Sequence, residues 1–520
     1  MPLPVDPSMA YRLLGFVVFV LASTRILQAQ TLVPIENPEP ESAGHFGWSV
    51  APLSDIDGDG ATDFLIGAPG RSVDGTDSAG RAFVISGATR LPLLTLSSPG
   101  ASSNGQFGWD VTGLPDATGD GLPELLIGAP FERYGTVPRA GNVYVFSGTG
   151  DFLFPTIGLP QVDANHGYAL VAIPDGAIEG WDFLIGTPGY SFTPPGRSGA
   201  FTIHDGMNGA ITRAFETGGV PSELGTSVAA TDADLDGLID SCVGSPGISN
   251  GRGRAECVFR DTAASPRQKF YFAPLDAERF GRTLSAISDR NGDGANDLFF
   301  GSLGEAFVYS AVSGDRLLEL RPENGEQMDF GRSLDEAGDL DGDGDDDLLV
   351  GAPNAEVEGT AGAGVVLVVR FSDGSQVLRL ESLSPEADGQ FGWDVKRTDD
   401  LDGDGQADFL VGAPGEAEGG GRAYLVLTNG VSTSLLSAPE PSLALSIAPN
   451  PVAHTLRLSA NSGGPAVLEA YDSLGRRVWE AETLGSEIRR VDVTTWEAGV
   501  YIVRLRSNSG TVTKRFVVTR

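Results

Sequence analysis

Short acidic loops are the feature of this sequence with the clearest chemistry. The first reads Asp55-Ile-Asp57-Gly-Asp59-Gly60-Ala-Thr-Asp63, with carboxylates at positions 1, 3, 5 and 9 and glycine at position 6. Alternate carboxylates can surround a hard cation, and the glycine permits the sharp turn that brings them together. The pattern occurs unchanged in three more loops, at Asp232, Asp234, Asp236 and Asp240, at Asp339, Asp341, Asp343 and Asp347, and at Asp400, Asp402, Asp404 and Asp408.

Two further loops keep the pattern with conservative changes, and one has lost it. The two are Asp116, Thr118, Asp120 and Glu124, and Asp289, Asn291, Asp293 and Asp297. The loop without the pattern has Pro174, Gly176, Ile178 and Asp182 at the equivalent positions, which predicts a plain turn. Because all ligands are oxygens, Ca²⁺ is favoured over Zn²⁺ or copper, and the flexible all-protein cage favours it over Mg²⁺. We expect about six Ca²⁺ sites, since ordinary solvated Asp-Gly turns would not share one register.

The acidic loops belong to a repeat that organises residues 31–430. Each of seven blocks starts at Phe-Gly or its equivalent and closes at Gly-Ala-Pro or a variant of it, with the loop between. A block contains four strand-like runs, and repeats of this kind are typical of β-propellers. We therefore predict an all-β fold whose main part is a seven-bladed β-propeller. The blocks start at Phe46, Phe107, His166, Leu224, Phe280, Phe330 and Phe391.

The ring of blades must also close. The last block has a third strand over residues 422–427 but no fourth strand of its own, whereas residues 31–36 stand before the first Phe-Gly as fourth strands stand before the others. We predict that residues 31–36 pair with residues 422–427. This pairing would join the first and last blades without leaving an open sheet edge.

Charge and composition exclude several classes of protein. Asp and Glu number 70 against 35 Lys and Arg, so the net charge of −35 repels nucleic acid and anionic membranes. The 71 Gly and 33 Pro argue against long helices. Residues 1–29 read as a signal peptide, because Arg12 precedes an apolar run over 13–22 that is too short to cross a bilayer. The mature chain, from about residue 30, is predicted to have no transmembrane helix.

The Phe-Gly, acidic-loop and Gly-Ala-Pro blocks resemble the FG-GAP repeats of the integrin α-subunit propeller, over residues 31 to about 430. The resemblance implies Ca²⁺ in the loops of one face and partner contacts through loops of the opposite face. Two of the loops after Gly-Ala-Pro carry aromatic residues with arginine, as interface anchors do. The alternative is that these side chains fold over their own blade. They are Phe131, Arg133, Tyr134, Tyr190, Phe192 and Arg197.

The chain after residue 430 has a different composition. Residues 431–445 form a Ser/Pro-rich linker, and strand-like runs in residues 446–520 predict a small β-sandwich. This segment resembles the C-terminal sorting domain of type IX secretion cargo. The resemblance implies contact with the type IX secretion machinery, and release from or attachment to the outer surface of a Bacteroidetes-like bacterium. It rests on Pro449-Asn450-Pro451, Tyr471-Asp472, Gly475-Arg476, Ala498-Gly499-Val500-Tyr501 and Lys514-Arg515-Phe516-Val517-Val518.

The remaining candidate residues point to binding rather than to catalysis. No set of side chains matches a catalytic arrangement, and Trp48, Trp109 and Trp393 are assigned to blade packing rather than to a ligand cage. Cys242 and Cys257 fall on adjacent predicted strands, where a disulfide and two reduced thiols both remain open. We interpret the chain as a secreted or surface-attached, Ca²⁺-binding, non-catalytic adhesion or binding module for an extracellular protein or glycan. The alternatives are an extracellular hydrolase using the propeller channel and a passive surface-layer component.

Overall fold

The computed structural model describes residues 30–155, 158, 160–175, 180–191, 197–216, 220–260, 267–272, 274, 277–322, 329–428, 444–448, 452, 454–507 and 510–519. The predicted signal peptide lies outside these residues, as do Pro449, Asn450, Pro451 and most of the predicted linker. The described part is all-β, as predicted, apart from one four-residue helix, α2 (Ile248–Gly251).

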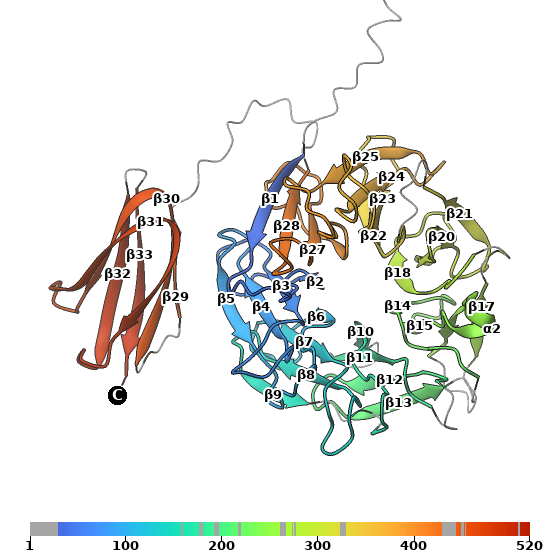
Figure 1. Ribbon diagram of the computed structural model, residues 1–520, viewed down its shortest axis with the longest axis horizontal. Coiled ribbons are helices and arrows are strands. Elements are labelled where there is room, and N and C mark those ends of the chain that lie inside the picture. Colours follow the sequence, from blue (N-terminus) through green and yellow to red (C-terminus); the bar gives the residue numbers. More distant parts are fainter. Residues whose placement is uncertain are drawn as a thin grey trace, which may run out of the picture.

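Seven four-stranded antiparallel sheets make up the described part of residues 31–427. Figure 1 shows them in a ring, following one another in chain order from blue to orange, which is the arrangement of a β-propeller. In the first six sheets the strands are consecutive in the chain. They are β2 (Val50–Pro52), β3 (Phe64–Ala68), β4 (Arg81–Ile85) and β5 (Pro92–Leu96); β6 (Val111–Leu114), β7 (Glu124–Ala129), β8 (Asn142–Phe146) and β9 (Phe152–Pro155); β10 (Ala169–Asp175), β11 (Gly180–Thr187), β12 (Ala200–Asp205) and β13 (Ile211–Glu216); β14 (Val228–Thr231), β15 (Asp240–Gly244), β16 (Ala255–Val258) and β17 (Gln268–Tyr271); β18 (Thr283–Ile287), β19 (Asp297–Gly301), β20 (Ala306–Tyr309) and β21 (Arg316–Leu320); and β22 (Ser333–Gly338), β23 (Asp347–Ala352), β24 (Val365–Val369) and β25 (Gln376–Glu381).

The seventh sheet joins the two ends of the ring. Its strand order is β1 (Thr31–Glu36), β28 (Arg422–Leu427), β27 (Phe409–Ala413) and β26 (Val395–Arg397). β1 runs antiparallel to β28, with Thr31 opposite Leu427 and Glu36 opposite Arg422. The predicted closure by residues 31–36 is therefore confirmed. The main-chain groups of β28 are paired on both sides, so the ring has no open edge there.

The glycines of the repeat meet where neighbouring blades touch. A Cβ atom on Gly67 of Gly-Ala-Pro would collide with the carbonyl oxygen of Gly108 in the next Phe-Gly, and one on Gly412 would collide with that of Gly47. Gly47 also has a φ of +86°, in the region that favours glycine. The two ends of each block are thus fixed by a close approach of backbones across a blade boundary.

Apolar side chains fill the space between the blades. Phe46, Phe107 and Phe280 of the Phe-Gly pairs are fully buried. One hydrophobic cluster combines residues of β3 and β4, such as Leu65 and Val84, with residues of β7 and β8 in the next blade. Separate clusters of the same kind lie at the other blade boundaries, including the one between the last and first blades, so apolar contacts hold neighbouring blades together around the ring.

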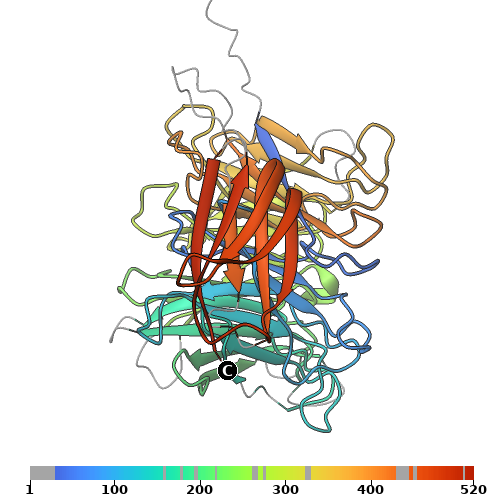
Figure 2. The same ribbon diagram turned by 90° about the vertical axis from the view of Figure 1, so that its left-hand side faces the viewer.

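The C-terminal domain is a separate five-stranded sheet, shown in Figure 2 as the red and orange strands. Its strand order is β29-β30-β32-β33, and β31 pairs with β30. The pairing of β30 with β31 continues through a register shift between Asn461 and Pro465. Both β29 and β32 pair with β30, and the domain has its own apolar cluster, including Leu458, Leu468 and Phe516. The strands are β29 (Ala444–Ala448), β30 (Thr455–Tyr471), β31 (Arg477–Asp492), β32 (Gly499–Ser507) and β33 (Gly510–Val518).

Candidate metal-binding loops and central cavity

Each acidic loop connects the first strand of a blade to the second. In the first blade the carboxylate of Asp55 accepts hydrogen bonds from the backbone N–H groups of Gly58 (2.7 Å), Asp59 (3.1 Å) and Gly60 (2.8 Å). The loop therefore wraps around its first carboxylate, as the glycine at position 6 predicts. The carboxylates of Asp116, Asp289, Asp339 and Asp400 accept the same set of bonds in their loops, and Asp232 accepts those from positions 5 and 6.

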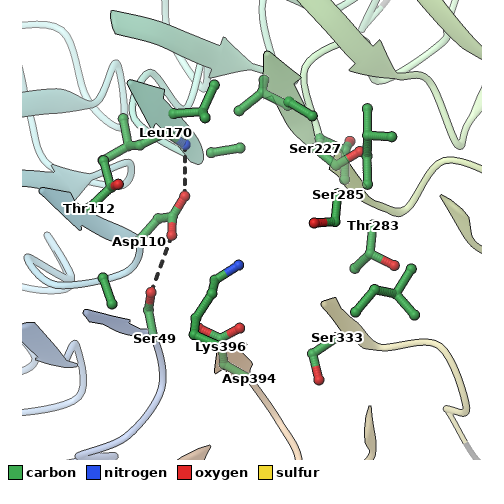
Figure 3. Close-up of a pocket in the computed structure, with 18 of the residues that line it drawn as sticks. Ser49, Asp110, Thr112, Leu170, Ser227, Thr283, Ser285, Ser333, Asp394 and Lys396 are labelled. Carbon is green, nitrogen blue, oxygen red and sulfur yellow. Dashed lines mark hydrogen bonds between the residues drawn. The ribbon is translucent and has the colours of Figure 1, made fainter. Parts of the chain in front are cut away.

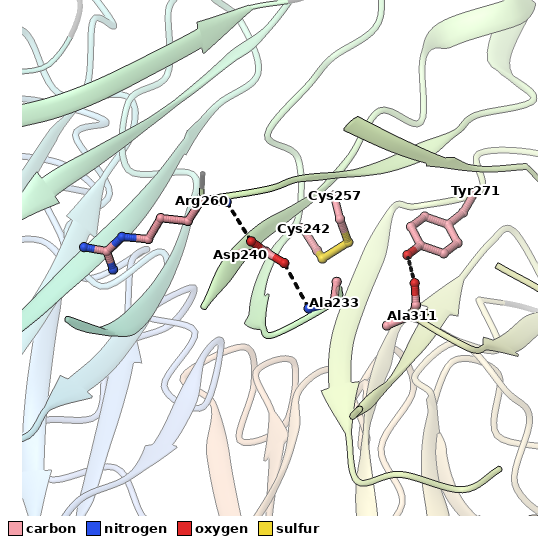
Figure 4. Close-up of a disulfide and its surroundings, with 7 residues drawn as sticks. All are labelled: Ala233, Asp240, Cys242, Cys257, Arg260, Tyr271 and Ala311. Carbon is pink, nitrogen blue, oxygen red and sulfur yellow. Dashed lines mark hydrogen bonds between the residues drawn. A yellow bond between two sulfur atoms is a disulfide. The ribbon is translucent and has the colours of Figure 1, made fainter. Parts of the chain in front are cut away.

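The last carboxylate of each loop stands at the start of the second strand and is buried. Asp63 is fully buried and accepts bonds from the N–H groups of Ile56 (2.8 Å) and Gly87 (3.0 Å), so it ties the loop to the end of β4. Asp240 makes equivalent bonds with Ala233 and Arg260, and Figure 4 shows both. The ninth position is thus part of the blade core as well as of the loop.

Carboxylate oxygens gather within 4.8 Å of one another in five of the loops. Burial raises the pKa of Asp63, Asp240 and Asp297 to about 6, and neighbouring carboxylates in the loops add to the effect. The same causes raise the pKa of Asp347 and Asp408 to about 7. The five clusters are Asp55, Asp57 and Asp63; Asp116, Asp120 and Glu124; Asp232, Asp234 and Asp240; Asp339, Asp341 and Asp347; and Asp400, Asp402 and Asp404.

These loops fit a Ca²⁺ ion by their chemistry. Asp234 and Asp347 each have a buried carboxylate oxygen, Oδ1, that accepts no hydrogen bond. A buried anionic oxygen without a partner is costly, and a cation would satisfy it. The donors are carboxylates alone, the ligand type that Ca²⁺ takes in flexible loops.

The loop of the fifth blade departs from the other five. The amide of Asn291 donates a hydrogen bond to Asp297 (3.2 Å). The hydroxyl of Ser310 donates one to Asp293 (2.8 Å), as that of Ser86 does to Asp59 in the first blade (3.3 Å). Among the described residues, no three acids of this loop meet as in the others. The carboxylates of Asp293 and Asp297 thus have partners inside the protein. A sixth Ca²⁺ site, predicted at Asp289, Asn291, Asp293 and Asp297, has less support than the other five.

Some predicted ligands lie outside the clusters, and arginines that the sequence did not single out lie beside them. Asp59, Thr118, Asp236, Asp343 and Asp408 are not members of the three-acid groups. Arg370 forms ion pairs with Asp341 and with Asp343 (3.0 Å), and Arg267 pairs with Asp234 (2.6 Å). These arginines lie on later strands or turns of the same blade, so the local motif carries no sign of them.

In the third blade the first two strands extend into the region where the other blades have an acidic loop. Pro174 pairs with Trp181, and Asp175 with Gly180, at the end of the β10–β11 hairpin. Gly176 and Ile178 lie outside the described residues, and the carboxylate of Asp182 reaches Arg260 (3.5 Å). The predicted plain turn itself falls on residues 176–179, which lie outside the described residues.

The predicted partner loops lie at the other end of the blades. Phe131 packs edge-on against Trp109, with ring centroids 5.1 Å apart, and the guanidinium of Arg139 covers its face. Tyr134 pairs with Val137 in a tight loop. The side chains of Arg133 and Arg197 are exposed, and that of Tyr190 is half-buried. Phe192 lies outside the described residues. One aromatic side chain of this set therefore folds onto its own blade, and the arginines face solvent.

A disulfide links Cys242 and Cys257 in the fourth blade (Figure 4). The two residues are directly opposite in the β15–β16 pair, with Cα atoms 4.0 Å apart, and both are buried. Of the two states left open by the sequence, the structure has the bridge. A disulfide is consistent with a protein that leaves the cytoplasm.

A cavity of about 830 Å³ lies in the centre of the ring, lined by the first strands and by the residues just before them. Asp110 accepts hydrogen bonds from Ser49 (3.2 Å) and from the backbone N–H of Leu170 (2.7 Å) in the next blade, as Figure 3 shows. Asp394 accepts the N–H of Val50 (2.9 Å). Burial, with the nearby charge of Asp394, raises the pKa of Asp110 to about 6.

Apart from Trp48, Trp109 and Trp393, the lining residues of this cavity were not recognised from the sequence, because they are dispersed over all seven blocks. One position, the third after the Phe of each block, lines the cavity in all seven blades and is polar in every blade except the third, which has Ala169. At this position Ser227, Thr283 and Ser333 donate to carbonyl oxygens of Gly281 (2.8 Å), Gly331 (2.7 Å) and Gly392 (2.9 Å) in the following blade. Aligning the blocks position by position would have shown this column of polar residues.

Comparison with known proteins agrees with these two domains. The FG-GAP repeat family matches residues 46–85, 107–146, 330–369 and 391–426, and the secretion system C-terminal sorting domain matches residues 446–519. Integrin α-PS2 of Drosophila melanogaster is 39% identical over 113 residues, which are 20% of this chain and 8% of that protein. Integrin α-4 of Xenopus laevis is 28% identical over 198 residues, 36% of this chain and 18% of the relative.

A hydrolase is also among the similar proteins. Phosphatidylinositol-glycan-specific phospholipase D of Mus musculus is 32% identical over 163 residues, 29% of this chain and 19% of that enzyme. The chain thus matches less than a fifth of the length of each of these three relatives. Among the described residues, no helix has the length and apolar character that crossing a membrane requires. The chain therefore carries FG-GAP repeats like those of integrin α-subunits and ends in a secretion-system sorting domain, which directs export to the cell surface or the extracellular space.

Proposed function

We propose that this protein is a Ca²⁺-stabilised propeller that acts outside the cell as a non-catalytic adhesion or binding module. The observation that carries the proposal is the set of five carboxylate clusters, two of which contain a buried oxygen without a hydrogen-bond partner. In this view the residues of each cluster hold one ion, which offsets the repulsion between their charges. The sorting domain brings the propeller to the outside through the type IX secretion machinery.

The binding face is assigned to the loops after Gly-Ala-Pro. In each blade the acidic loop joins the first strand to the second, and the loop after Gly-Ala-Pro joins the second strand to the third. Because consecutive strands are antiparallel, these two loops lie at opposite ends of the blade. The exposed guanidinium groups of Arg133 and Arg197 stand on this face, and Arg side chains are enriched at interface hot spots. Ca²⁺ would therefore support the fold from one end while a protein or glycan ligand is bound at the other.

An array of extracellular matrix proteins and glycans, probed with the exported chain in Ca²⁺, tests this proposal. We expect retention of at least one ligand, a loss of retention in Arg133→Ala or Arg197→Ala, and no loss in Arg316→Ala. Arg316 is a matched control because it is exposed on the outer strand β21. Binding that is absent from the whole array, or equal in all the variants, would contradict the assignment.

A second candidate function is extracellular hydrolysis. It is favoured by the similarity to phosphatidylinositol-glycan-specific phospholipase D, which covers 29% of this chain. The assay is release of product from a phosphatidylinositol-glycan substrate by the exported chain with Ca²⁺ present. Turnover that Asp394→Asn abolishes would favour the hydrolase, because Asp394 lines the central cavity.

A further inference from the structure

One end of the central cavity is surrounded by a ring of large side chains. Each blade contributes the second residue after its Phe position, and all seven line the cavity. We call this set the Trp/Arg ring. The members of the ring directly precede the first strand of each blade, whereas the acidic loops follow that strand. The ring therefore lies at the end of the cavity opposite the acidic loops. Its members are Trp48, Trp109, Tyr168, Thr226, Arg282, Arg332 and Trp393.

The aromatic members of the ring form a continuous arc. Trp48 contacts Trp393 and Trp109, with ring centroids 4.5 Å and 4.8 Å apart, and Trp109 contacts Tyr168 at 5.2 Å. The planes are tilted against one another by 46° to 47°, so no ring is covered by a parallel neighbour. All four side chains remain partly exposed at the cavity. The arc thus offers fixed aromatic surface to a ligand, at a low cost in side-chain entropy.

The arginines lie on the other side of the ring, and they differ in their partners. Arg282 forms an ion pair with Asp329 (2.7 Å). The guanidinium of Arg332 lies over the ring of Trp393, 4.2 Å from its centroid, and forms neither an ion pair nor a side-chain hydrogen bond among the described residues. Burial and the like charge of Arg282 lower the pKa of Arg332. Arg332 therefore retains its donors for an external acceptor, in a position where an anion would be stabilised.

The layer below the ring has the opposite chemistry. Asp110 and Asp394 present carboxylates there, and the hydroxyls of Ser227, Thr283 and Ser333 already donate to the protein and keep only acceptor capacity. Lys396 points into the cavity between these groups, as Figure 3 shows. Oxygen acceptors of this kind suit the hydroxyl groups of a ligand, and the carboxylates of Asp110 and Asp394 outnumber the single ammonium of Lys396, so the layer disfavours a second anionic group.

These two layers define what can be bound. The ligand needs an anionic group at the level of Arg332, an apolar face against the tryptophans and hydroxyl groups directed deeper. We propose that the Trp/Arg ring and the layer beneath it bind an acidic saccharide, with its carboxylate at Arg332 and a pyranose face on the tryptophan arc. This proposal rests on the binding function proposed above and specifies a glycan as its ligand. The cavity volume of about 830 Å³ is within the range of roughly 300–1,000 Å³ found for small-ligand sites.

An acidic peptide is the main competing ligand, and the structure disfavours it. A peptide with several carboxylates would place at least one of them near Asp110 and Asp394, in a protein whose net charge is already −35. A saccharide with one carboxylate on every second ring avoids this repulsion.

The test uses the exported full chain in constant Ca²⁺ and isothermal titration with three probes. They are a hyaluronan tetrasaccharide, the neutral chitotetraose of equal ring number, and a peptide of four glutamates. We expect the hyaluronan fragment to bind at least about tenfold more tightly than the other two and to change the tryptophan fluorescence. Arg332→Gln should weaken this binding by about tenfold or more, as expected for a lost charged hydrogen bond. Arg316→Gln, with its arginine outside the cavity, should leave it unchanged.

Each contrary result overturns the proposal. No binding of the hyaluronan fragment, equal binding of chitotetraose or of the peptide, or unchanged affinity in Arg332→Gln would do so. If Arg332→Gln does not fold, Arg332→Lys replaces it, since lysine keeps the charge but cannot make the two-pronged contact. Retention of a matrix protein on the array, without binding of the acidic saccharide, would refute this inference and leave the proposed binding function standing. An empty array would refute both.

Discussion

At the scale of single residues, the carboxylate that ends each acidic loop belongs both to the core of its blade and to the loop. Asp63, Asp347 and Asp408 are fully buried at the start of a core strand, and they also belong to the acidic loops. Burial raises the pKa of each of these acids, so the metal-free fold keeps them protonated to a higher pH than the unfolded chain does. A bound cation would have the opposite effect, because it stabilises the ionised form. The pH dependence of stability should therefore differ with and without Ca²⁺.

We predict that the protein stripped of divalent ions becomes less stable as pH rises from 5 to 8. The folded-state pKa of these acids is about 6 to 7, above their ordinary value of 3.8, so the folded chain holds more protons than the unfolded chain in this window. Their stabilising contribution is complete at low pH and is lost as pH rises through the folded-state pKa. In excess Ca²⁺ the melting temperature should not fall over the same range. Equal pH slopes in the two conditions would contradict the interpretation.

At the scale of strands and loops, the repeat was predictable because its signals are local. The acidic motif, the Phe-Gly start and the place of residues 31–36 before the first block were enough to predict four-stranded units and their closure by β1. The pairing of Asn291 with Asp297 and of Arg370 with Asp341 was not predictable, because it depends on side-chain geometry within one blade. Three members of the Trp/Arg ring, Trp48, Trp109 and Trp393, stood out in the sequence but were assigned to blade packing, whereas in the structure they line the central cavity and are partly exposed. The complete ring depends on residues from all seven blades, so no single block contains its pattern.

We predict that Gly412→Ala destabilises the propeller by about 1–3 kcal/mol or more. The added Cβ would collide with the backbone of Gly47 across the boundary between the last and first blades, and a backbone atom cannot move aside as a side chain can. Gly499→Ala is the matched control, since a Cβ there meets nothing within 4 Å. Urea unfolding of the two variants measures the difference. An equal, small effect of both substitutions would show that the close approach of the glycines is not required.

At the scale of the whole molecule, the sorting domain and the propeller are separate structural units. The apolar clusters of the propeller join neighbouring blades, and the C-terminal sheet has a separate apolar cluster around Leu468 and Phe516. The sorting domain matches residues 446–519, and the FG-GAP matches end at residue 426. The sorting domain can therefore be removed without cutting through the apolar clusters of either domain.

We predict that a chain truncated after residue 430, between β28 and β29, folds its propeller but stays inside the cell. The sheet that carries the sorting signal is then lost, whereas every strand from β1 to β28 is retained. Cell fractionation measures the location, and circular dichroism of the purified product measures folding. Truncated protein found at the surface or in the medium would show that the last domain is not needed for export.

Bound Ca²⁺ as a stabilising component of the propeller is the central claim, and thermal unfolding in excess chelator tests it most directly. A site at about a hundred times its dissociation constant contributes about 2.7 kcal/mol to the free energy of unfolding. Five such sites would make the free energy of unfolding depend strongly on bound Ca²⁺. We predict that the melting temperature of the exported chain falls clearly in excess chelator and is restored by added Ca²⁺ but not by equimolar Mg²⁺. A melting temperature that is the same with chelator and with Ca²⁺ would contradict the account.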